Sequence, residues 1–196
     1  MNAVKKNAIA RSLEKYFVWI DRMRVDRVVN ILKPYVEGRT LDIGTGDGHV
    51  AAALHDDIVG IDIVVPHRTS IEVREFDGIR IPFEDKSFDT VLACTSLHHA
   101  TNPDALIEEM KRVGKKIVLL EDNVDTLVDR WSVLSLHWKN DRMFELPYRS
   151  DGFRTLNNWK QFFEAHSLRL THCSRHPGIQ PDWFFLRHYL FVLETP

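Results

Sequence analysis

The segment Leu41–Val50, which reads LDIGTGDGHV, constrains the fold of this chain more than any other. A short apolar run leads into Gly44, Gly46 and Gly48, and a helical stretch follows. Glycine lets a backbone turn sharply and approach a ligand closely. The first amides of the helix that follows are unpaired and suit a polar ligand. The segment therefore predicts a strand, a ligand-binding loop and a helix, with a glycine turn that binds nothing as the alternative.

The spacing of this loop argues against a dinucleotide. Rossmann dehydrogenases use GxGxxG, whereas this chain has GxGxG with His49 where a third glycine would stand. Asp47 adds a negative charge beside the position of a pyrophosphate. An oxidoreductase that binds NAD or FAD is therefore disfavoured.

Alternation of short apolar runs with helical stretches predicts an α/β fold. The first 36 residues have helical periodicity, and Gly38 then interrupts the pattern. Because strands that alternate with helices form parallel sheets, we expect a sheet covered on both faces. The expected strands are 40–43, 58–63, 71–76, 90–94 and 117–120, with an antiparallel pair near 168–174 and 184–193. Asn102 is expected to cap a helix that ends at a left-handed Gly114.

Two acidic residues follow later strands of the predicted sheet. Asp62 ends the next strand and lies 20 residues after Asp42. A carboxylate at that place can accept hydrogen bonds from two ribose hydroxyls. Asp77 stands beside Gly78, just after the third strand. All these points lie at the carboxyl ends of strands, where open α/β sheets bind ligands.

Composition narrows the class of protein further. The chain has 196 residues and a formal net charge of −2, which fits one domain and disfavours nonspecific binding to nucleic acid. No apolar run approaches the roughly 20 residues of a membrane span. The two cysteines form neither a disulfide framework nor a zinc cluster, so we expect no metal and a reducing, cytoplasmic setting.

At this point the sequence resembles the class I S-adenosylmethionine-dependent methyltransferases, most closely the type-11, UbiE-like group. The resembling segments are LDIGTGDG, VGID, FDGIRIPFEDKSFDTVLACTSLHHATNP and KKIVLLE. The resemblance implies a Rossmann-like, doubly wound, mostly parallel sheet of seven strands with an antiparallel C-terminal hairpin. It also implies transfer of a methyl group from S-adenosylmethionine, by direct in-line displacement, to an unidentified small-molecule acceptor.

The resemblance also assigns residues to parts of the cofactor. The residues expected around its methionine part and sugar are Asp42, Gly44, Thr45, Gly46 and Gly48. Asp62 would hold the ribose hydroxyls, Ile63 would lie against the adenine, and Asp77 with Gly78 would contact the adenine edge. Cys94, at the end of the fourth strand, would line the methionine end, although a small buried hydrophobe is its ordinary role.

One departure from the family concerns the second crossover. Only Val64–Ser70 separate the second and third strands, too few for the usual helix. The sheet face left uncovered there suits the N-terminal helices or a partner chain. The alternative function is therefore a cofactor-binding partner or regulatory subunit without catalysis, and a homodimer is one possible assembly.

The chain is expected to divide its single domain, residues 1–196, into three parts. Residues 1–38 form a helical cap, residues 39–123 bind the cofactor, and residues 124–196 hold an acceptor-side insertion and the last strands. His98 and His99 are candidate general bases. The alternative is that these histidines only pack or cap the loop. The TSLHH segment differs from the D/N-P-P-Y motif of amide and amino-adenine methyltransferases. Candidate acceptor contacts are Tyr16, Phe17, Trp19, Trp131, His137, Trp138, Arg142, Met143, Phe144, Tyr148 and Arg149, most of which we expect to serve packing.

Overall fold

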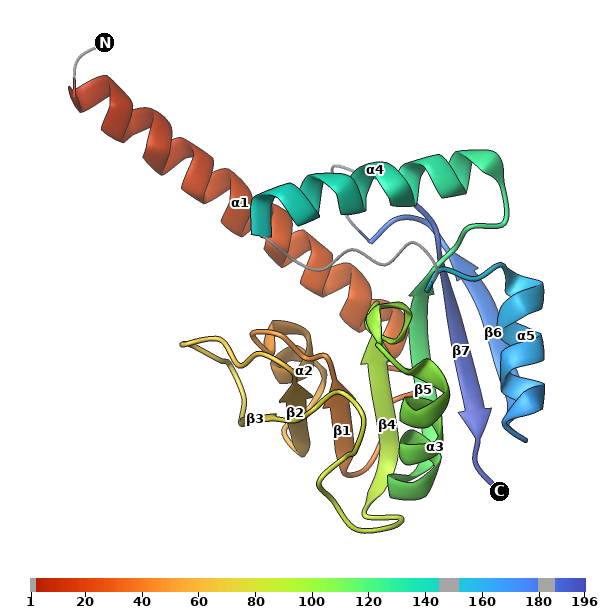
Figure 1. The fold of residues 1–196 in the computed structure, drawn as a ribbon. Coiled ribbons are helices and arrows are strands. Elements are labelled where there is room, and N and C mark those ends of the chain that lie inside the picture. Colours follow the sequence, from red (N-terminus) through yellow and green to blue (C-terminus); the bar gives the residue numbers. More distant parts are fainter. Residues whose placement is uncertain (1–2, 145–151, 180–185) are drawn as a thin grey trace.

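The computed structural model describes residues 3–144, 152–179 and 186–196. Its centre is a sheet of seven strands in the order β3-β2-β1-β4-β5-β7-β6 (Figure 1). The strands are β1 Thr40–Ile43, β2 Ile58–Asp62, β3 Val73–Glu75, β4 Phe88–Cys94, β5 Gly114–Asp122, β6 Arg169–His176 and β7 His188–Glu194. The helices are α1 Ala3–Leu32, α2 His49–Leu54, α3 Pro103–Val113, α4 Leu127–Phe144 and α5 Leu156–Ala165, with a 3-10 helix at Leu97–His99.

The sheet confirms the predicted fold class. Strands β3, β2, β1, β4 and β5 pair in parallel, so their carboxyl ends meet at one edge. Strand β7 pairs antiparallel with both β5 and β6. The order reverses between β1 and β4, which creates the crevice where such sheets bind ligands.

Two hydrophobic cores cover the two faces of the sheet. On one face, Val28 and Leu32 of α1 and Leu54 of α2 pack against Leu92 and Leu120. On the other face, α3 and α5 contribute the larger core, whose biggest buried side chains include Trp159, Phe88, Phe163 and Phe191. Because residues two apart on a strand share a face, the α1 face also receives Cys94, Asp122 and His188.

Helix α1 is much longer than the face it covers. Its 30 residues span about 45 Å at 1.5 Å per residue. The carboxyl half packs on the sheet through Val25, Val28 and Leu32, whereas the amino half extends beyond the body of the molecule (Figure 1). Within the residues described, neither α1 nor any other helix combines the length and the apolar character that a membrane span needs.

The link from β2 to β3 contains no helix, as predicted from its length. Residues 63–72 run instead through bends and short irregular turns. Ile63, Val64 and Val65 of this link are exposed, with 71% of Val64 accessible to solvent. The corner of the sheet at β3 therefore leaves apolar side chains uncovered.

Of the two predicted ends of α3, the amino end is correct and the carboxyl end is wrong. Asn102 does cap the helix, because its side chain accepts a hydrogen bond from the amide of Ala105 at 3.0 Å. Gly114, however, is extended (φ −110°) and begins β5, so the predicted left-handed end is wrong. A Cβ at Gly114 would lie 2.4 Å from Cγ2 of Val91. Close packing against β4, and not a turn, is what requires glycine there.

Candidate active site

The glycine loop leaves β1 in a conformation that side chains rarely adopt. Gly46 has φ +58°, and a Cβ added there would meet no atom within 4 Å. Backbone conformation alone therefore requires this glycine, and the space beside it is open. Gly44, with φ +69°, also lies against Ser96 after β4, because an added Cβ would come 2.5 Å from that side chain. The loop thus joins the ends of β1 and β4.

Asp62 holds the loop from the neighbouring strand. Its Oδ2 accepts the amide of Gly46 at 2.8 Å, and its Oδ1 accepts the amide of Val64 at 3.3 Å. A carboxylate has about four acceptor positions, so these two bonds leave capacity for a hydroxyl. Asp62 therefore both shapes the loop and offers an acceptor beside it.

Asp42 lies buried beneath the same loop. Its Oδ2 accepts the hydroxyl of Thr45 at 2.7 Å. Burial raises the pKa of Asp42 to about 7, the nearby Asp62 carboxylate adds to that rise, and the Thr45 hydroxyl opposes it. A cation placed beside Asp42 would reverse the shift, because opposite charge favours the ionised carboxylate.

Asp77, Gly78 and Ile63 come together at the next strand ends. The Oδ1 of Asp77 accepts the amides of Ile79 and Arg80 at 2.8 and 2.7 Å, which lowers the pKa of this exposed carboxyl. A Cβ on Gly78 (φ +78°) would lie 3.2 Å from Cγ2 of Ile63. The three residues assigned to the adenine from sequence therefore lie together.

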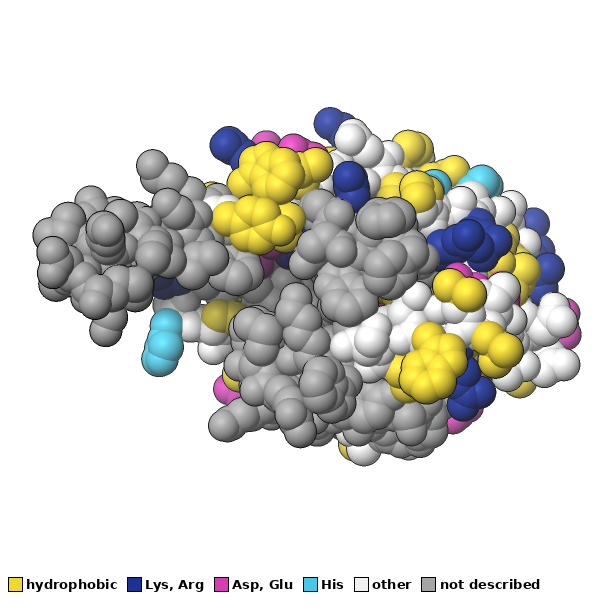
Figure 2. Space-filling view, turned by 90° about the horizontal axis from the view of Figure 1, so that it is seen from above, with side chains coloured by type: hydrophobic (Ala, Val, Ile, Leu, Met, Phe, Trp, Pro, Cys, Tyr) yellow, Lys and Arg dark blue, Asp and Glu magenta, His cyan; other side chains and the backbone are white. Residues whose placement is uncertain are grey.

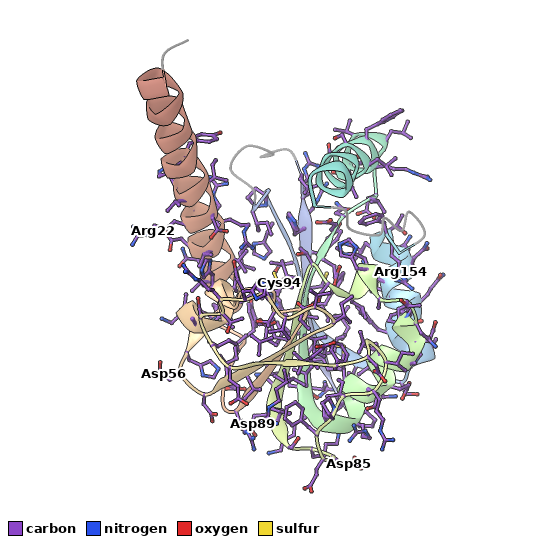
Figure 3. All side chains as sticks on the ribbon, turned by 60° about the vertical axis from the view of Figure 1, so that its left-hand side comes forward. Arg22, Asp56, Asp85, Asp89, Cys94 and Arg154 are labelled. Carbon is purple, nitrogen blue, oxygen red and sulfur yellow. The ribbon has the colours of Figure 1, made fainter. Side chains whose placement is uncertain are left out.

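Cys94 faces a small cavity of about 50 Å³ that includes an arginine not expected from the sequence. The cavity is lined by Arg24, Asp42, Gly44, Thr45, Asp47, Val50 and Cys94. Burial raises the pKa of the Cys94 thiol to about 12, so it stays protonated and acts as a small polarisable contact. Figure 3 shows Cys94 near the middle of the molecule, whereas Arg22 points outward from α1.

Arg24 reaches the cavity from α1 and is held there by an ionic network. Its Nε and Nη2 donate to Oδ1 of Asp21 at 3.1 and 2.9 Å. Oδ2 of Asp21 lies 3.1 Å from Nδ1 of His49, the first residue of α2. Burial favours a higher pKa for Asp21, but its contacts with Arg24 and His49 outweigh that and lower it. In the sequence, the one sign of this role is the position of Arg24, one helical turn before Val28, which the structure shows to be buried.

The two candidate histidines differ sharply in their surroundings. His98 is buried, and its Nδ1 contacts Oε2 of Glu121 while Oε1 of Glu121 accepts the amide of Leu97 at 2.9 Å. Burial favours a lower pKa for His98, but the Glu121 carboxylate outweighs it and raises the pKa. His99 is exposed, and its ring packs against that of His98 with the centroids 4.1 Å apart and the planes tilted by 46°. His98 is thus fixed in place by a carboxylate, and His99 is reachable from outside.

The candidate acceptor residues are less fully placed. Tyr16 and Trp19 on α1 and Trp131 on α4 are all exposed. Figure 2 shows several groups of hydrophobic side chains on this upper face. The side chains of Phe17, His137, Trp138, Arg142, Met143 and Phe144, and all of Tyr148 and Arg149, fall outside what the structure describes.

Comparison with known proteins agrees with this geometry. A family model for a methyltransferase domain, of type 11, matches residues 41–119. An uncharacterized protein of Methanocaldococcus jannaschii is 30% identical over 158 residues, which are 75% of this chain and 74% of that protein. A demethylmenaquinone methyltransferase of Roseiflexus is 32% identical over 120 residues. The chain belongs to the type-11 group of the class I S-adenosylmethionine-dependent methyltransferases.

Solved structures share the fold of this methyltransferase. An S-adenosylmethionine-dependent methyltransferase of Thermotoga maritima aligns with a TM-score of 0.67 at 15% identity, over 95% of this chain and 97% of its own. The methyltransferase bound by the Trm112 activator of Haloferax volcanii aligns with a TM-score of 0.64 at 17% identity, over 93% and 96%. By contrast, the alignment with the Roseiflexus enzyme covers 52% of this chain and half of that enzyme's length.

Replacing Asp62 by alanine tests the ribose assignment. We expect Asp62→Ala to weaken binding of S-adenosylhomocysteine by at least about tenfold, because hydrogen bonds to a charged group contribute about 1.5–3 kcal/mol. The matched control is Asp56→Ala, an exposed carboxyl in the turn before β2. Titration calorimetry of both variants measures the difference, and equal affinities would refute the assignment.

Proposed function

We propose that this methyltransferase moves a methyl group from S-adenosylmethionine to a small-molecule acceptor by direct in-line displacement. The observation that carries the proposal is the joint between Gly46 and Asp62. It fixes a carboxylate beside an open loop, next to the cavity that Arg24, Asp42 and Cys94 line. That set of groups matches a ligand with a diol, an ammonium and a carboxylate.

The residues present fit the cofactor one group at a time. Asp62 accepts from the ribose hydroxyls, and Ile63 with Gly78 forms an apolar edge for the adenine. Buried Asp42 pairs with the ammonium of the methionine part, which returns its carboxyl to the ionised form. Arg24 offers two donors to the methionine carboxylate, and in doing so it gives up its hydrogen bonds to Asp21.

Little covalent chemistry is required of the protein in this reaction. The cofactor supplies a sulfonium methyl group that is already activated. The chain's own residues hold the two reactants in line and exclude water, and such positioning supplies about 7–11 kcal/mol in favourable systems. Arg24, Asp42 and Asp62 therefore act by placing charge and hydrogen bonds around the methyl donor.

The acceptor class follows from what surrounds the site. The TSLHH segment lacks the motif for amide or amino-adenine acceptors. Aromatic side chains on α1 and α4 suit an apolar or aromatic ligand. Because relatives from Roseiflexus and Staphylococcus haemolyticus are named demethylmenaquinone methyltransferases, an aromatic hydroquinone is the first acceptor class to test. This chain spans 50% and 59% of their lengths, so that class rests on this proposal.

Methyl transfer itself is the decisive experiment. Labelled S-adenosylmethionine is incubated with the protein and either a metabolite extract or 1,4-naphthohydroquinone, and the labelled product is identified by mass spectrometry. We expect label to appear on one low-molecular-weight compound. If neither S-adenosylmethionine nor S-adenosylhomocysteine binds at millimolar concentration, the proposal is wrong.

Arg24 gives a second test, with a control on the same helix. We expect Arg24→Ala to weaken S-adenosylhomocysteine binding by at least about tenfold, since a charged pair is lost. Binding of adenosine, which lacks the methionine carboxylate, should change less than about threefold. Arg22→Ala serves as control, because Arg22 points outward (Figure 3). Calorimetry in which both arginine variants bind alike would contradict the role of Arg24.

The raised pKa of Asp42 predicts a pH dependence of binding. In the free protein Asp42 binds a proton below about pH 7, and the ligand's ammonium requires the ionised form. Affinity for S-adenosylhomocysteine should therefore rise about tenfold from pH 6 to pH 8 and level off above. The variant Asp42→Asn should bind more weakly and without this slope. A wild-type affinity that is equal at both pH values would count against the Asp42 contact.

A second candidate function is a cofactor-binding partner that lacks catalysis of its own. The exposed Ile63, Val64 and Ile79 near β3 favour it, because an uncovered sheet corner suits a partner chain or a second copy. One structural neighbour is itself held by an activator protein. Light scattering over a range of concentrations separates the two: a monomer that turns over would remove this candidate.

A further inference from the structure

We infer that Asp122 and His188 form the base of the acceptor site, with Nδ1 of His188 taking the proton that the acceptor loses. This inference rests on the proposed function. The two residues face each other across the β5–β7 pair, and Nε2 of His188 lies 2.9 Å from Oδ1 of Asp122. Both are buried, with 1% of His188 and 4% of Asp122 exposed.

The Asp122 contact fixes the tautomer of His188. A carboxylate only accepts hydrogen bonds, so the proton of a neutral His188 ring stands on Nε2. The other nitrogen, Nδ1, then carries a bare lone pair. Among the residues that the structure describes, no group makes a hydrogen bond to Nδ1 of His188. An unpaired buried polar atom costs free energy, and a bound acceptor that donates to Nδ1 would satisfy it.

Strand register places this pair beside the cofactor cavity. Cys94 pairs with Leu120, and Asp122 is the next residue of β5 on the same face. Two residues along a strand advance about 6.6–6.8 Å. Helix α1 packs on this face through Val28 and Leu32, and Arg24 lies one turn farther toward the same end. Arg24, Cys94, Asp122 and His188 therefore gather at one end of one sheet face.

Other titratable groups lie close to the Asp122–His188 pair. Oδ2 of Asp122 lies 3.8 Å from Nε2 of His98, whose Nδ1 contacts Glu121. On β6, His176 is the register partner of His188, and burial together with His172 and His188 lowers the pKa of His176. Among the described residues, Asp122 and His176 face His188 directly, and His98 with Glu121 lies behind Asp122. Glu121 holds His98 through Nδ1, and His98 in turn lies near Asp122.

The step balances as a single displacement. The electron pair of the acceptor atom forms the bond to the methyl carbon, and the carbon–sulfur bond breaks with its electrons going to sulfur. The acceptor's proton moves to Nδ1 of His188, and Asp122 stabilises the imidazolium that results. A positioned base of this kind contributes about 10²–10⁴-fold in rate.

The test uses a variant that removes the basic nitrogen but keeps the contact with Asp122. In His188→Gln the side-chain amide replaces Nε2 and keeps a donor for Asp122, while the lone pair of Nδ1 is lost. We expect methyl transfer to the labelled compound from the extract to fall at least about 100-fold. Affinity for S-adenosylhomocysteine should change less than threefold. The control His176→Gln, on the neighbouring strand, should retain activity within about threefold.

A second readout does not depend on turnover. Long-range proton–nitrogen NMR of protein with ¹⁵N-labelled histidine, saturated with S-adenosylhomocysteine at pH 8, reports the tautomer of each ring. We expect the signals of the tautomer with its proton on Nε2 for His188, assigned by their loss in His188→Gln. A proton on Nδ1, or full activity in His188→Gln, would overturn the inference while leaving the proposed function intact. Absence of cofactor binding by the wild type would instead defeat the proposed function, and the same NMR measurement on the ligand-free protein would still report the tautomer of His188.

Discussion

The hydrogen bond from the Gly46 amide to Oδ2 of Asp62 joins the loop after β1 to the end of β2. The position of Asp62 relative to the loop and to Asp42 depends on this hydrogen bond. It places Asp62 close enough to Asp42 for the two carboxylates to repel, which adds to the raised pKa of Asp42. It also leaves the space beside Gly46 open, since no atom lies where its Cβ would be. A site that gathers negative charge around an open loop favours a cationic ligand.

The features predicted from sequence were those that local chemistry determines. A sharp glycine turn after β1, an acidic residue at the end of β2 and a link from β2 to β3 too short for the usual helix each depend on a few neighbours. The structure confirms all three. Gly114 shows the limit of this reasoning, because glycine is required there by the close approach of Val91 on another strand and not by a turn.

The features missed from sequence depend on residues far apart in the chain. Arg24 enters the cavity because α1 packs on the sheet by its carboxyl half, and Asp122 meets His188 through the antiparallel β5–β7 register. His98 was a candidate base by position, but its contact with Glu121 across 23 positions reveals an anchored ring. Sequence spacing and composition do not predict these contacts, because the residues come together only when the sheet forms.

The uncovered corner at β3 also bears on how the protein behaves at high concentration. An edge strand offers unpaired amides and carbonyls to other chains, and exposed valines beside it make such pairing more favourable. Here β3 has only three residues, and Glu72, Arg74 and Glu75 place charges along it, with Arg74 and Glu72 paired at 2.8 Å. Short length and charge together resist strand addition. Neutralising substitutions at this small charged edge would therefore remove one barrier to edge-to-edge association.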